Sequence, residues 1–217
     1  NFYKYMKQWF PESMADGGGS STTKPTTPTT STPNIVWRPR TQIGSGWQTT
    51  VIHAGDFNGT GRPDLMLVTS AGKLMYYAGA PGEKFAKPVQ IGHGWQGIDW
   101  VQGGVDWDGD GNMDLVARVK KTGDLRVYPG NGRGGFKPMR KIGQGWGGIS
   151  QMTLTRTARG PAIYAISGDT LRYYPSNGQG GFGARKNVSA GWKNITYLAG
   201  VGDWTGDRIP DLLARDE

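Results

Sequence analysis

The sequence predicts an all-β fold, a β-propeller, and two recurring elements carry that prediction. A nine-residue acidic loop occurs three times, as DFNGTGRPD, DWDGDGNMD and DWTGDRIPD, beginning at Asp56, Asp106 and Asp203. A second element, IGSGW, IGHGW, IGQGW and VSAGW, begins at residues 43, 91, 142 and 188, so that the starts are 48, 51 and 46 residues apart. Such a period, built from short alternating strands, is typical of one four-stranded propeller blade per repeat.

Within each repeat the elements follow in a constant order. The acidic loop leads into an apolar strand (DLMLV, DLVARV, DLLAR), and a tight turn leads into a second strand (KLMYYAG, DLRVYPG, TLRYYPS). A glycine-rich turn ending in Phe follows (GEKF, GRGGF, GQGGF), and the GxGW segment closes the repeat. Alternation such as that of Leu125-Arg126-Val127-Tyr128 has the period of two that marks a strand. With 37 Gly and 13 Pro in the chain, long helices are not expected.

The third repeat keeps its strands but lacks the acidic loop. At the corresponding place stands TRTARGPAI, from Thr155 to Ile163, which contains no carboxylate. The flanking strands AIYAIS and TLRYYPS are retained. We therefore expect this blade to fold without a metal ion.

The two ends of the repeat region predict how the propeller closes. The chain ends at DLLARDE, after the first strand of a fourth repeat, whereas residues 34–47 look like the later strands of a repeat. Joined, the two ends complete one blade and leave no open sheet edge. We therefore expect four blades, with the N- and C-terminal strands sharing one. The alternative is that the chain was cut from a larger propeller.

The segment before the repeats differs in kind. Residues 1–16, beginning NFYKYMKQWFPE, are expected to form a short amphipathic helix, the last helix of a missing upstream domain. The alternative is a helix that binds a membrane surface or a partner. Residues 17–34 are rich in Gly, Ser, Thr and Pro and predict a flexible linker. The propeller is then expected over residues 35–217.

The motifs resemble those of a known repeat family. The loop DWDGDGNMDL, the GxGGF turn and the blade-length period resemble FG-GAP/VCBS-type repeats, which occur in integrin α-chain propellers and in many secreted bacterial proteins. The variant with GxGW and DLLAR is similar to the C-terminal modules of secreted actinobacterial hydrolases. The resemblance covers about residues 35–217, and it implies a calcium-binding propeller that is accessory to an enzyme.

Each acidic loop carries oxygen side chains at positions 1, 3, 5 and 9, the pattern that suits a hard cation such as calcium. The resemblance implies the following ligands, with the residue at position 7 contributing its carbonyl: Asp56, Asn58, Thr60, Arg62 and Asp64; Asp106, Asp108, Asp110, Asn112 and Asp114; Asp203, Thr205, Asp207, Ile209 and Asp211. Up to three calcium ions are expected. The loops carry two, four and three carboxylates, so the middle loop should bind calcium most tightly.

The acidic loops have two other interpretations, an EF-hand and a turn without a metal ion. An EF-hand requires Glu at position 12, where this chain has Leu67, Ala117 and Ala214, so the EF-hand is excluded. The loops can also be metal-free turns, because Asp, Asn and Gly favour turns in any case. If calcium binds, its expected role is to hold a loop in place rather than to do chemistry.

The sequence gives little sign of an enzyme. His53 and His93 are the only histidines, and they stand at different places in the repeat. No GxSxG, HExxH or phosphate-binding loop is present. We therefore expect this chain to be non-catalytic.

Two sets of residues are candidates for binding a partner. Basic residues recur just before the GxGW element and are expected to form a rim that attracts polyanions, in a chain of net charge +8. They are Arg140, Lys141, Arg185 and Lys186, together with Arg40 and Lys87. The GxGW rings can stack on sugars or pack between blades, and packing is favoured because the motif persists in the repeat without a loop. They are Trp47, Trp95, Trp146 and Trp192.

Together these features predict a non-catalytic, calcium-binding propeller module that attaches a secreted enzyme to a cell wall or polysaccharide. The expected partner is a cell-envelope polysaccharide or an anionic wall polymer, and the expected location is extracellular or on the cell wall. A protein-interaction module and a structural spacer without a ligand are the alternatives. Nucleic acid is not expected, since no specific motif for it is present. No apolar run reaches transmembrane length.

Overall fold

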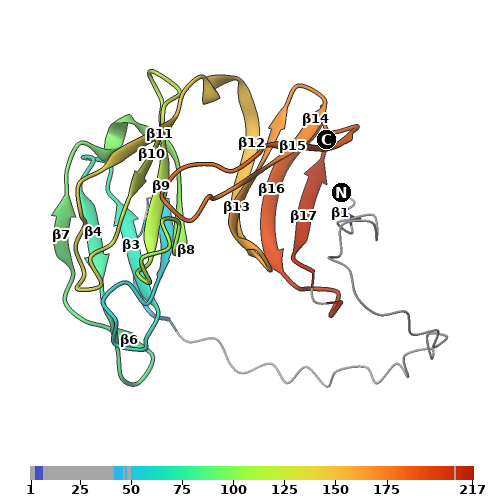
Figure 1. Ribbon diagram of the computed structural model, residues 1–217. Helices are drawn as coiled ribbons and strands as arrows, with labels where there is room; N and C mark the ends of the chain where they lie inside the picture. The colour runs from blue at the N-terminus through green and yellow to red at the C-terminus, as the bar shows by residue number, and fades with distance from the viewer. Residues whose placement is uncertain (1–2, 7–41, 46, 48–49, 208) are drawn as a thin grey trace, which may run out of the picture.

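The computed structural model describes residues 3–6, 42–45, 47, 50–207 and 209–217, and these form antiparallel sheets that follow one another along the chain (Figure 1). The first sheet has the order β2-β3-β4-β7: β2 Thr50–Gly55, β3 Asp64–Val68, β4 Leu74–Tyr77 and β7 Val89–Gly92. A small hairpin, β5 Gly79–Ala80 and β6 Lys84–Phe85, lies between β4 and β7 in the chain. The second sheet has the order β8-β9-β10-β11: β8 Ile98–Val105, β9 Asp114–Val119, β10 Leu125–Tyr128 and β11 Arg140–Gly143.

The third and fourth sheets form the other half of the described structure. The third has the order β12-β13-β14-β15: β12 Ile149–Thr157, β13 Gly160–Ser167, β14 Thr170–Pro175 and β15 Lys186–Ala190. The fourth has three strands in the order β16-β17-β1: β16 Ile195–Gly202, β17 Asp211–Asp216 and β1 Tyr3–Met6. The predicted all-β class and the four-stranded sheets are confirmed.

The sheets are offset by one strand from the repeat as it is written in the sequence. Each of the first three sheets begins with the strand that follows the GxGW element and ends with the strand that leads into the next one. The acidic loops of the first two sheets and of the fourth therefore join the first and second strands of one sheet, within a hairpin.

The GxGW element forms a sharp connection between neighbouring sheets, here termed the elbow. Gly94 and Gly145 adopt φ values of 78° and 75°, the left-handed region that side chains disfavour. The chain then forms short 3₁₀ turns, η2 Trp95–Gly97 and η3 Trp146–Gly148, before it enters the next sheet. The motif thus serves as a fixed corner, which explains why its glycines recur with the sheet.

The expectation of an N-terminal helix is wrong for residues 3–6. These residues form β1, which pairs antiparallel with β17 in the register Tyr3 to Arg215 through Met6 to Leu212. A short isolated helix is marginal in water, whereas the outer edge of β17 offers a row of backbone groups to pair with. The other residues of 1–16, and the linker predicted at 17–34, lie outside the described residues.

The first and last described strands do share a sheet, but not through the segment that the sequence suggested. Residues 42–45 and 47 are not in a strand, and residues 34–41 lie outside the described part. Strands β2 and β8 pack closely, as do β12 and β16, while β8 and β12 pack less extensively. Across the described residues β16 and β2 lack such packing. The predicted closure into a four-sheet ring is therefore not seen among them.

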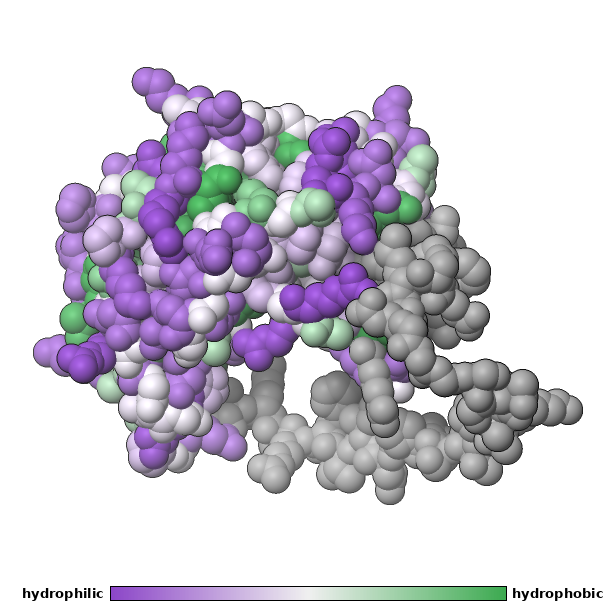
Figure 2. Space-filling view, viewed as in Figure 1, coloured by the Kyte–Doolittle hydropathy of each residue, from purple (hydrophilic) through white to green (hydrophobic). Residues whose placement is uncertain are grey.

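Apolar side chains fill the spaces between neighbouring sheets. Ile52 and Met66 of the first sheet share one buried cluster with Leu115 of the second. Tyr164 of the third sheet lies in another cluster with Leu198 of the fourth. The face seen in Figure 2 is mostly hydrophilic, with apolar residues in small separate patches. No helix in the described part of the chain is long and apolar enough to cross a membrane.

Candidate functional site

The last aspartate of each acidic loop is buried and held by the protein itself. The Asp64 carboxylate accepts hydrogen bonds from the backbone N–H of Phe57 at 2.9 Å, the hydroxyl of Tyr76 at 2.8 Å and the N–H of Gly79 at 2.7 Å. Burial and the Asp64 carboxylate together raise the pKa of the Tyr76 hydroxyl well above its usual value. Asp64 therefore ties the start of its own loop to the glycine-rich turn that follows β4.

The same arrangement recurs in the second sheet. The Asp114 carboxylate accepts hydrogen bonds from the N–H groups of Trp107 at 2.8 Å, Asp108 at 3.2 Å and Gly130 at 2.8 Å. Burial raises the pKa of Asp114 to about 6, and the nearby Asp108 charge adds to the effect of burial. In the fourth sheet, buried Asp211 accepts the N–H of Thr205 at 2.8 Å.

The third sheet lacks this aspartate and satisfies the matching N–H group in another way. Ala162 stands at the corresponding position, one residue before the pairing of Ile163 with Tyr174. The N–H of Ser176, which matches Gly130, instead donates to the carbonyl of Pro161 at 2.9 Å. A backbone acceptor thus replaces the carboxylate at this place in the third sheet.

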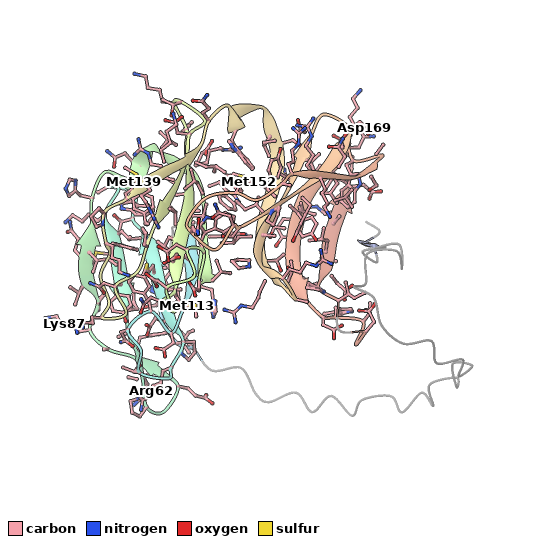
Figure 3. All side chains as sticks on the ribbon, viewed as in Figure 1. Arg62, Lys87, Met113, Met139, Met152 and Asp169 are labelled. Atoms are coloured by element: carbon pink, nitrogen blue, oxygen red, sulfur yellow. The ribbon has the colours of Figure 1, made fainter. Side chains whose placement is uncertain are left out.

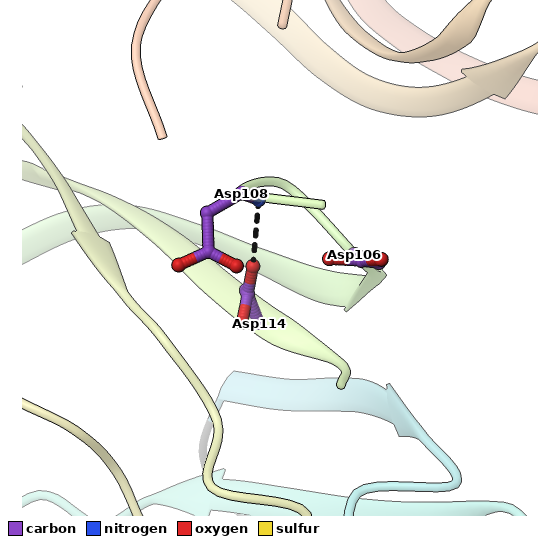
Figure 4. Close-up of side chains that lie close together, drawn as sticks. All are labelled: Asp106, Asp108 and Asp114. Atoms are coloured by element: carbon purple, nitrogen blue, oxygen red, sulfur yellow. Dashed lines mark hydrogen bonds between the residues drawn. The ribbon is translucent and has the colours of Figure 1, made fainter. Parts of the chain in front are cut away.

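The middle loop brings three of its predicted ligands together. One oxygen from each of Asp106, Asp108 and Asp114 lies within 4.8 Å of the others, and Figure 4 shows Asp114 beside Asp108, with Asp106 to one side. The Oδ1 atom of Asp108 is buried and has no hydrogen-bond partner. A buried acceptor without a donor is costly unless something else satisfies it. This cluster could hold a metal ion.

Two basic side chains also reach the middle loop. Lys137 forms an ion pair with Asp110, and Arg140 lies 2.5 Å from Asp108 Oδ2. Burial pushes the pKa of Asp110 upward, but the hydrogen bonds from Lys137 and Asn112 outweigh it and hold the pKa below its usual value. Asp110 is thus directed to Lys137 rather than into the carboxylate cluster.

The first and third loops are arranged as turns. Asp56 accepts the N–H groups of Thr60 at 2.8 Å and Gly61 at 2.7 Å, and Asn58 accepts the N–H of Thr60 at 3.2 Å. Thr60 and Arg62 are exposed.

In the third loop, the carboxylate of Asp207 accepts the N–H of Ile209 at 2.9 Å, while Asp203 and Thr205 are exposed. In the described chain, the carboxylates of this loop do not gather as those of the middle loop do. The turn hydrogen bonds themselves are shared with the middle loop, where Asp106 accepts the N–H groups of Gly109, Asp110 and Gly111.

The GxGW rings pack between sheets rather than facing solvent. Trp95, Trp146 and Trp192 are buried, and Trp47 is partly buried. The ring of Trp95 lies 4.8 Å from that of Tyr128 in the next sheet, and the ring of Trp146 lies 4.6 Å from that of Tyr174. The packing alternative thus holds for the three buried rings, which leave no free face for a sugar to stack on.

The elbow nevertheless borders a hollow of about 170 Å³ between the first and second sheets. The elbow contributes His93, Gly94, Trp95, Gly97 and Ile98, and the second sheet contributes Val119, Arg126 and Tyr128. The third elbow borders a second hollow, of about 380 Å³. Its residues Ala190, Gly191, Trp192, Asn194 and Ile195 occupy the same places in the repeat, and Asp216 matches Val119. This pocket, here termed the elbow pocket, is therefore found at the first and third of the three elbows between described sheets.

Sequence reasoning missed the elbow pocket, because it looked for ligands among the GxGW rings. One feature of the sequence could have indicated the pocket, namely the variable position of the GxGW motif. His93 stands there, where the other copies have Ser45, Gln144 and Ala190. A position that varies inside a fixed corner is where specificity can differ between copies. Arg126, in β10, is distant in sequence from the elbow and could be placed there only by the fold.

The predicted basic rim is partly neutralised. Arg140 pairs with Asp108, and Lys141 lies 2.8 Å from Asp124. Lys87 and Arg185 are exposed, Lys186 is partly buried, and Arg40 lies outside the described residues. The rim is therefore less strongly positive than the count of basic residues implied.

Comparison with known proteins gives one family match and a shared fold. Residues 56–117 match the sequence model of the FG-GAP-like repeat. The chain is similar to the lectin BP39L from Burkholderia pseudomallei, with a TM-score of 0.56 and 13% identity, over 85% of this chain and 55% of that one. It is also similar to an Agrocybe aegerita lectin described as recognising non-reducing terminal N-acetylglucosamine, with a TM-score of 0.52 and 17% identity, over 77% of this chain and 44% of that one.

The chain thus spans about half the length of each of these two structures. At such low identity the likeness shows the β-propeller fold alone. No curated protein matches the chain.

Proposed function

Because the chain carries an FG-GAP-like repeat on a β-propeller fold, we propose that it is a non-catalytic module that binds carbohydrate at its elbow pockets. The recurrence of the pocket at the same repeat positions carries this proposal. A pocket present twice gives two weak sites on one body, and two such sites bind a polymer far more tightly together than singly.

The complete elbow pocket has the chemistry that a sugar requires. Arg126 offers several N–H donors for hydroxyl groups, and His93 and the Tyr128 hydroxyl can donate or accept. The ring of Tyr128 and the edge of Trp95 supply an apolar wall. A few polar groups set against an aromatic wall are typical of small-molecule sites. The two structurally similar lectins support the choice of ligand class.

Calcium belongs to this proposal as a stabilising ion of the middle loop. The three clustered carboxylates and the buried Asp108 oxygen without a partner support it, and calcium prefers oxygen ligands of this kind. Asp106, Asp108 and Asp114 would hold the ion, whose charge would offset the mutual repulsion of the three carboxylates.

The module is further proposed to attach a secreted enzyme to a cell wall or polysaccharide. The Thr/Pro-rich segment at 17–34 supports this role, because such segments commonly separate a catalytic domain from a binding module.

A pull-down on insoluble polysaccharides, including chitin as a polymer of N-acetylglucosamine, tests the proposal. We expect Arg126→Ala to weaken binding by about tenfold, since a lost hydrogen bond from a charged group is worth roughly 1.5 kcal/mol or more. Tyr128→Phe keeps the packing of the ring and removes only the hydroxyl, so it should weaken binding to a smaller degree. The matched control is Lys121→Ala, which removes an exposed charge that does not line the pocket.

The salt dependence separates the carbohydrate proposal from simple charge attraction. Binding at the elbow pocket should survive 0.5 M NaCl and be competed by soluble N-acetylglucosamine oligomers. Binding that disappears in salt and responds equally to Arg126→Ala and Lys121→Ala would instead indicate an anionic wall polymer on the basic surface. Wild-type protein that binds none of the polysaccharides would contradict the proposal.

A further inference from the structure

Two of the junctions between described sheets contain a cluster of four aromatic rings, one ring from each of four repeat positions. Between the second and third sheets, Trp107 of the acidic loop lies 5.3 Å from Phe182 of the next glycine-rich turn. Phe182 also stacks with Trp146 at 5.5 Å and contacts Tyr174 at 5.9 Å. Trp107 is fully buried by this cluster and its surroundings. The second residue of the loop is therefore the ring that one sheet inserts into the next.

The same cluster joins the first and second sheets. Phe57, also fully buried, lies 5.1 Å from Phe136, which in turn lies 6.1 Å from Tyr128. Tyr128 contacts Trp95 at 4.8 Å, which completes the set of four.

Backbone contacts accompany the rings at both junctions. The carbonyl of Phe57 accepts the N–H of Gly134 at 3.4 Å, and the carbonyl of Trp107 accepts the hydroxyl of Ser176 at 2.5 Å. The loop of one sheet thus fits onto the glycine-rich turn of the next, and the two junctions define one recurring interface.

Each end of the described structure carries one half of this interface. Trp204 holds the loop position of Phe57 and Trp107, yet it is 68% exposed, where those two rings are 0% exposed. Its neighbours Tyr197 and Val201 are also exposed, at 47% and 38%. The fourth sheet therefore presents an inserting ring that nothing in the described chain receives.

The first sheet presents the receiving half. Phe85 lies 6.5 Å from Trp47 and 6.4 Å from Tyr77, so three of the four rings are in place. In the described residues no ring from a preceding loop lies against Phe85, and these three rings border a hollow of about 460 Å³. The missing member of this cluster is an aromatic ring at the second position of an acidic loop.

The two halves match in charge but stand apart in space. Asp203 and Asp207 flank Trp204, while Lys84 and Lys87 border the hollow, with Glu83 as the one acid there. Figure 3 shows Lys87 at the outer side of the first sheet. In Figure 1, β6 lies at the lower left and the turn between β16 and β17 at the lower right. Within one copy the described halves lie at opposite ends.

We propose that two copies of this chain associate head to tail, with Trp204 of one copy inserted between Trp47, Tyr77 and Phe85 of the other. The contact repeats the interface that already joins the sheets within a chain. It is heterologous, because the surface that inserts differs from the surface that receives. A buried Trp at the centre of such a contact is expected to dominate the affinity.

Analytical ultracentrifugation of wild type, Trp204→Ala and Phe85→Ala tests the proposal. The wild type should associate reversibly, and each single variant should weaken association by about tenfold or more. A one-to-one mixture of the two variants should restore dimers, because Phe85 of the first variant can receive Trp204 of the second. Such a mixed dimer keeps one intact contact and cannot grow. Met139→Ala, which removes another exposed apolar side chain, is the control and should associate like wild type.

Thermal melts distinguish a variant that has lost association from one that has lost its fold. Trp204 is mostly exposed in a single copy, so Trp204→Ala should melt like wild type at dilutions where both are monomeric. If Phe85→Ala fails to fold, Lys84→Glu with Lys87→Glu serves as the receiving-side variant and should weaken association in the same way. A wild type that stays monomeric at every concentration measured would overturn the proposal, and a fall in its melting temperature on Trp204→Ala would then place Trp204 in a contact within its own chain. Association that is unaffected by Trp204→Ala would overturn it as well.

Discussion

Different aspartates of the acidic loop serve different functions. The aspartate at position nine accepts backbone N–H groups from its own loop, and in the first two sheets it also reaches the glycine-rich turn. It therefore acts as a buried structural acceptor whether or not a metal ion is present. The earlier aspartates of the middle loop, Asp106 and Asp108, lie close enough to Asp114 to supply a metal ion with further oxygens, although Asp106 also accepts N–H groups of its own loop and Asp108 also pairs with Arg140. Replacing Tyr76, one of the hydrogen-bond donors to Asp64, with Phe tests this structural function by itself.

Tyr76→Phe is expected to destabilise the protein by about 1–2 kcal/mol, because hydrogen bonds to buried charged groups contribute that much or slightly more. The ring of Tyr76 packs 5.8 Å from Phe57 and is retained in the variant, so only the hydrogen bond to Asp64 is lost. Urea denaturation followed by Trp fluorescence gives the free energy of unfolding. Tyr77→Phe is the control, since the Tyr77 hydroxyl makes no hydrogen bond in the described residues. An effect of Tyr76→Phe no larger than that of the control would contradict the structural function of Asp64.

At the scale of elements, the loop and the glycine-rich turn act as one unit. The segment after β10 places Lys137 and Arg140 next to carboxylates of the loop that precedes β9. Arg140 and a calcium ion would compete for Asp108, whereas Lys137 holds Asp110 away from the three clustered carboxylates. Removing both bases would therefore free Asp108 and allow Asp110 to turn toward the ion, and exposed ion pairs of this kind are weak enough to be displaced.

The variant Lys137→Ala/Arg140→Ala is therefore expected to bind calcium about fivefold more tightly than wild type. Isothermal titration calorimetry measures the affinity directly. Calcium should also raise the melting temperature of both proteins, and EGTA should lower it again, because an ion that binds only the folded state stabilises it.

Lys141→Ala provides the matched control, since Lys141 pairs with Asp124 rather than with the cluster. Its calcium affinity should equal that of wild type. A double variant that binds calcium no better than this control would show that the two bases do not compete with the ion. A wild type whose melt is the same in calcium and in EGTA would argue against a calcium site altogether.

The sequence predicts local elements well and distant partners poorly. The strands follow from alternation and the elbow from its fixed glycines, because both depend on neighbouring residues. The sequence predicts a helix for the N-terminal segment, whereas Tyr3–Met6 form a strand. The pairing that makes them a strand involves β17 at the far end of the chain, which no local pattern indicates. In the same way, no local pattern brings Arg140 to Asp108, or Arg126 to the elbow of His93.

At the scale of the whole molecule, the described sheets form a row in which each packs on its neighbours. The contacts between inner strands run from β2 to β8, from β8 to β12 and from β12 to β16. In such an array stability is approximately a sum of unit and nearest-neighbour terms. The inner-strand contact between β8 and β12 is less extensive than the other two, so the loop ring Trp107 is expected to carry a larger share of the packing between the second and third sheets.

Trp107→Ala removes the ring that the second sheet inserts into the third, and it is expected to cost about 3–5 kcal/mol, as for other buried Trp side chains. Because the inner strands contact each other less extensively at that junction, the variant should unfold in two steps, with the first pair of sheets and the second pair losing structure separately. Calorimetry together with circular dichroism would detect the split as non-coincident transitions. Trp204→Ala alters the same repeat position where the ring is 68% exposed, so it should leave the unfolding of the monomer unchanged and cooperative. If Trp107→Ala were as mild as Trp204→Ala, the loop ring would not be what joins one sheet to the next.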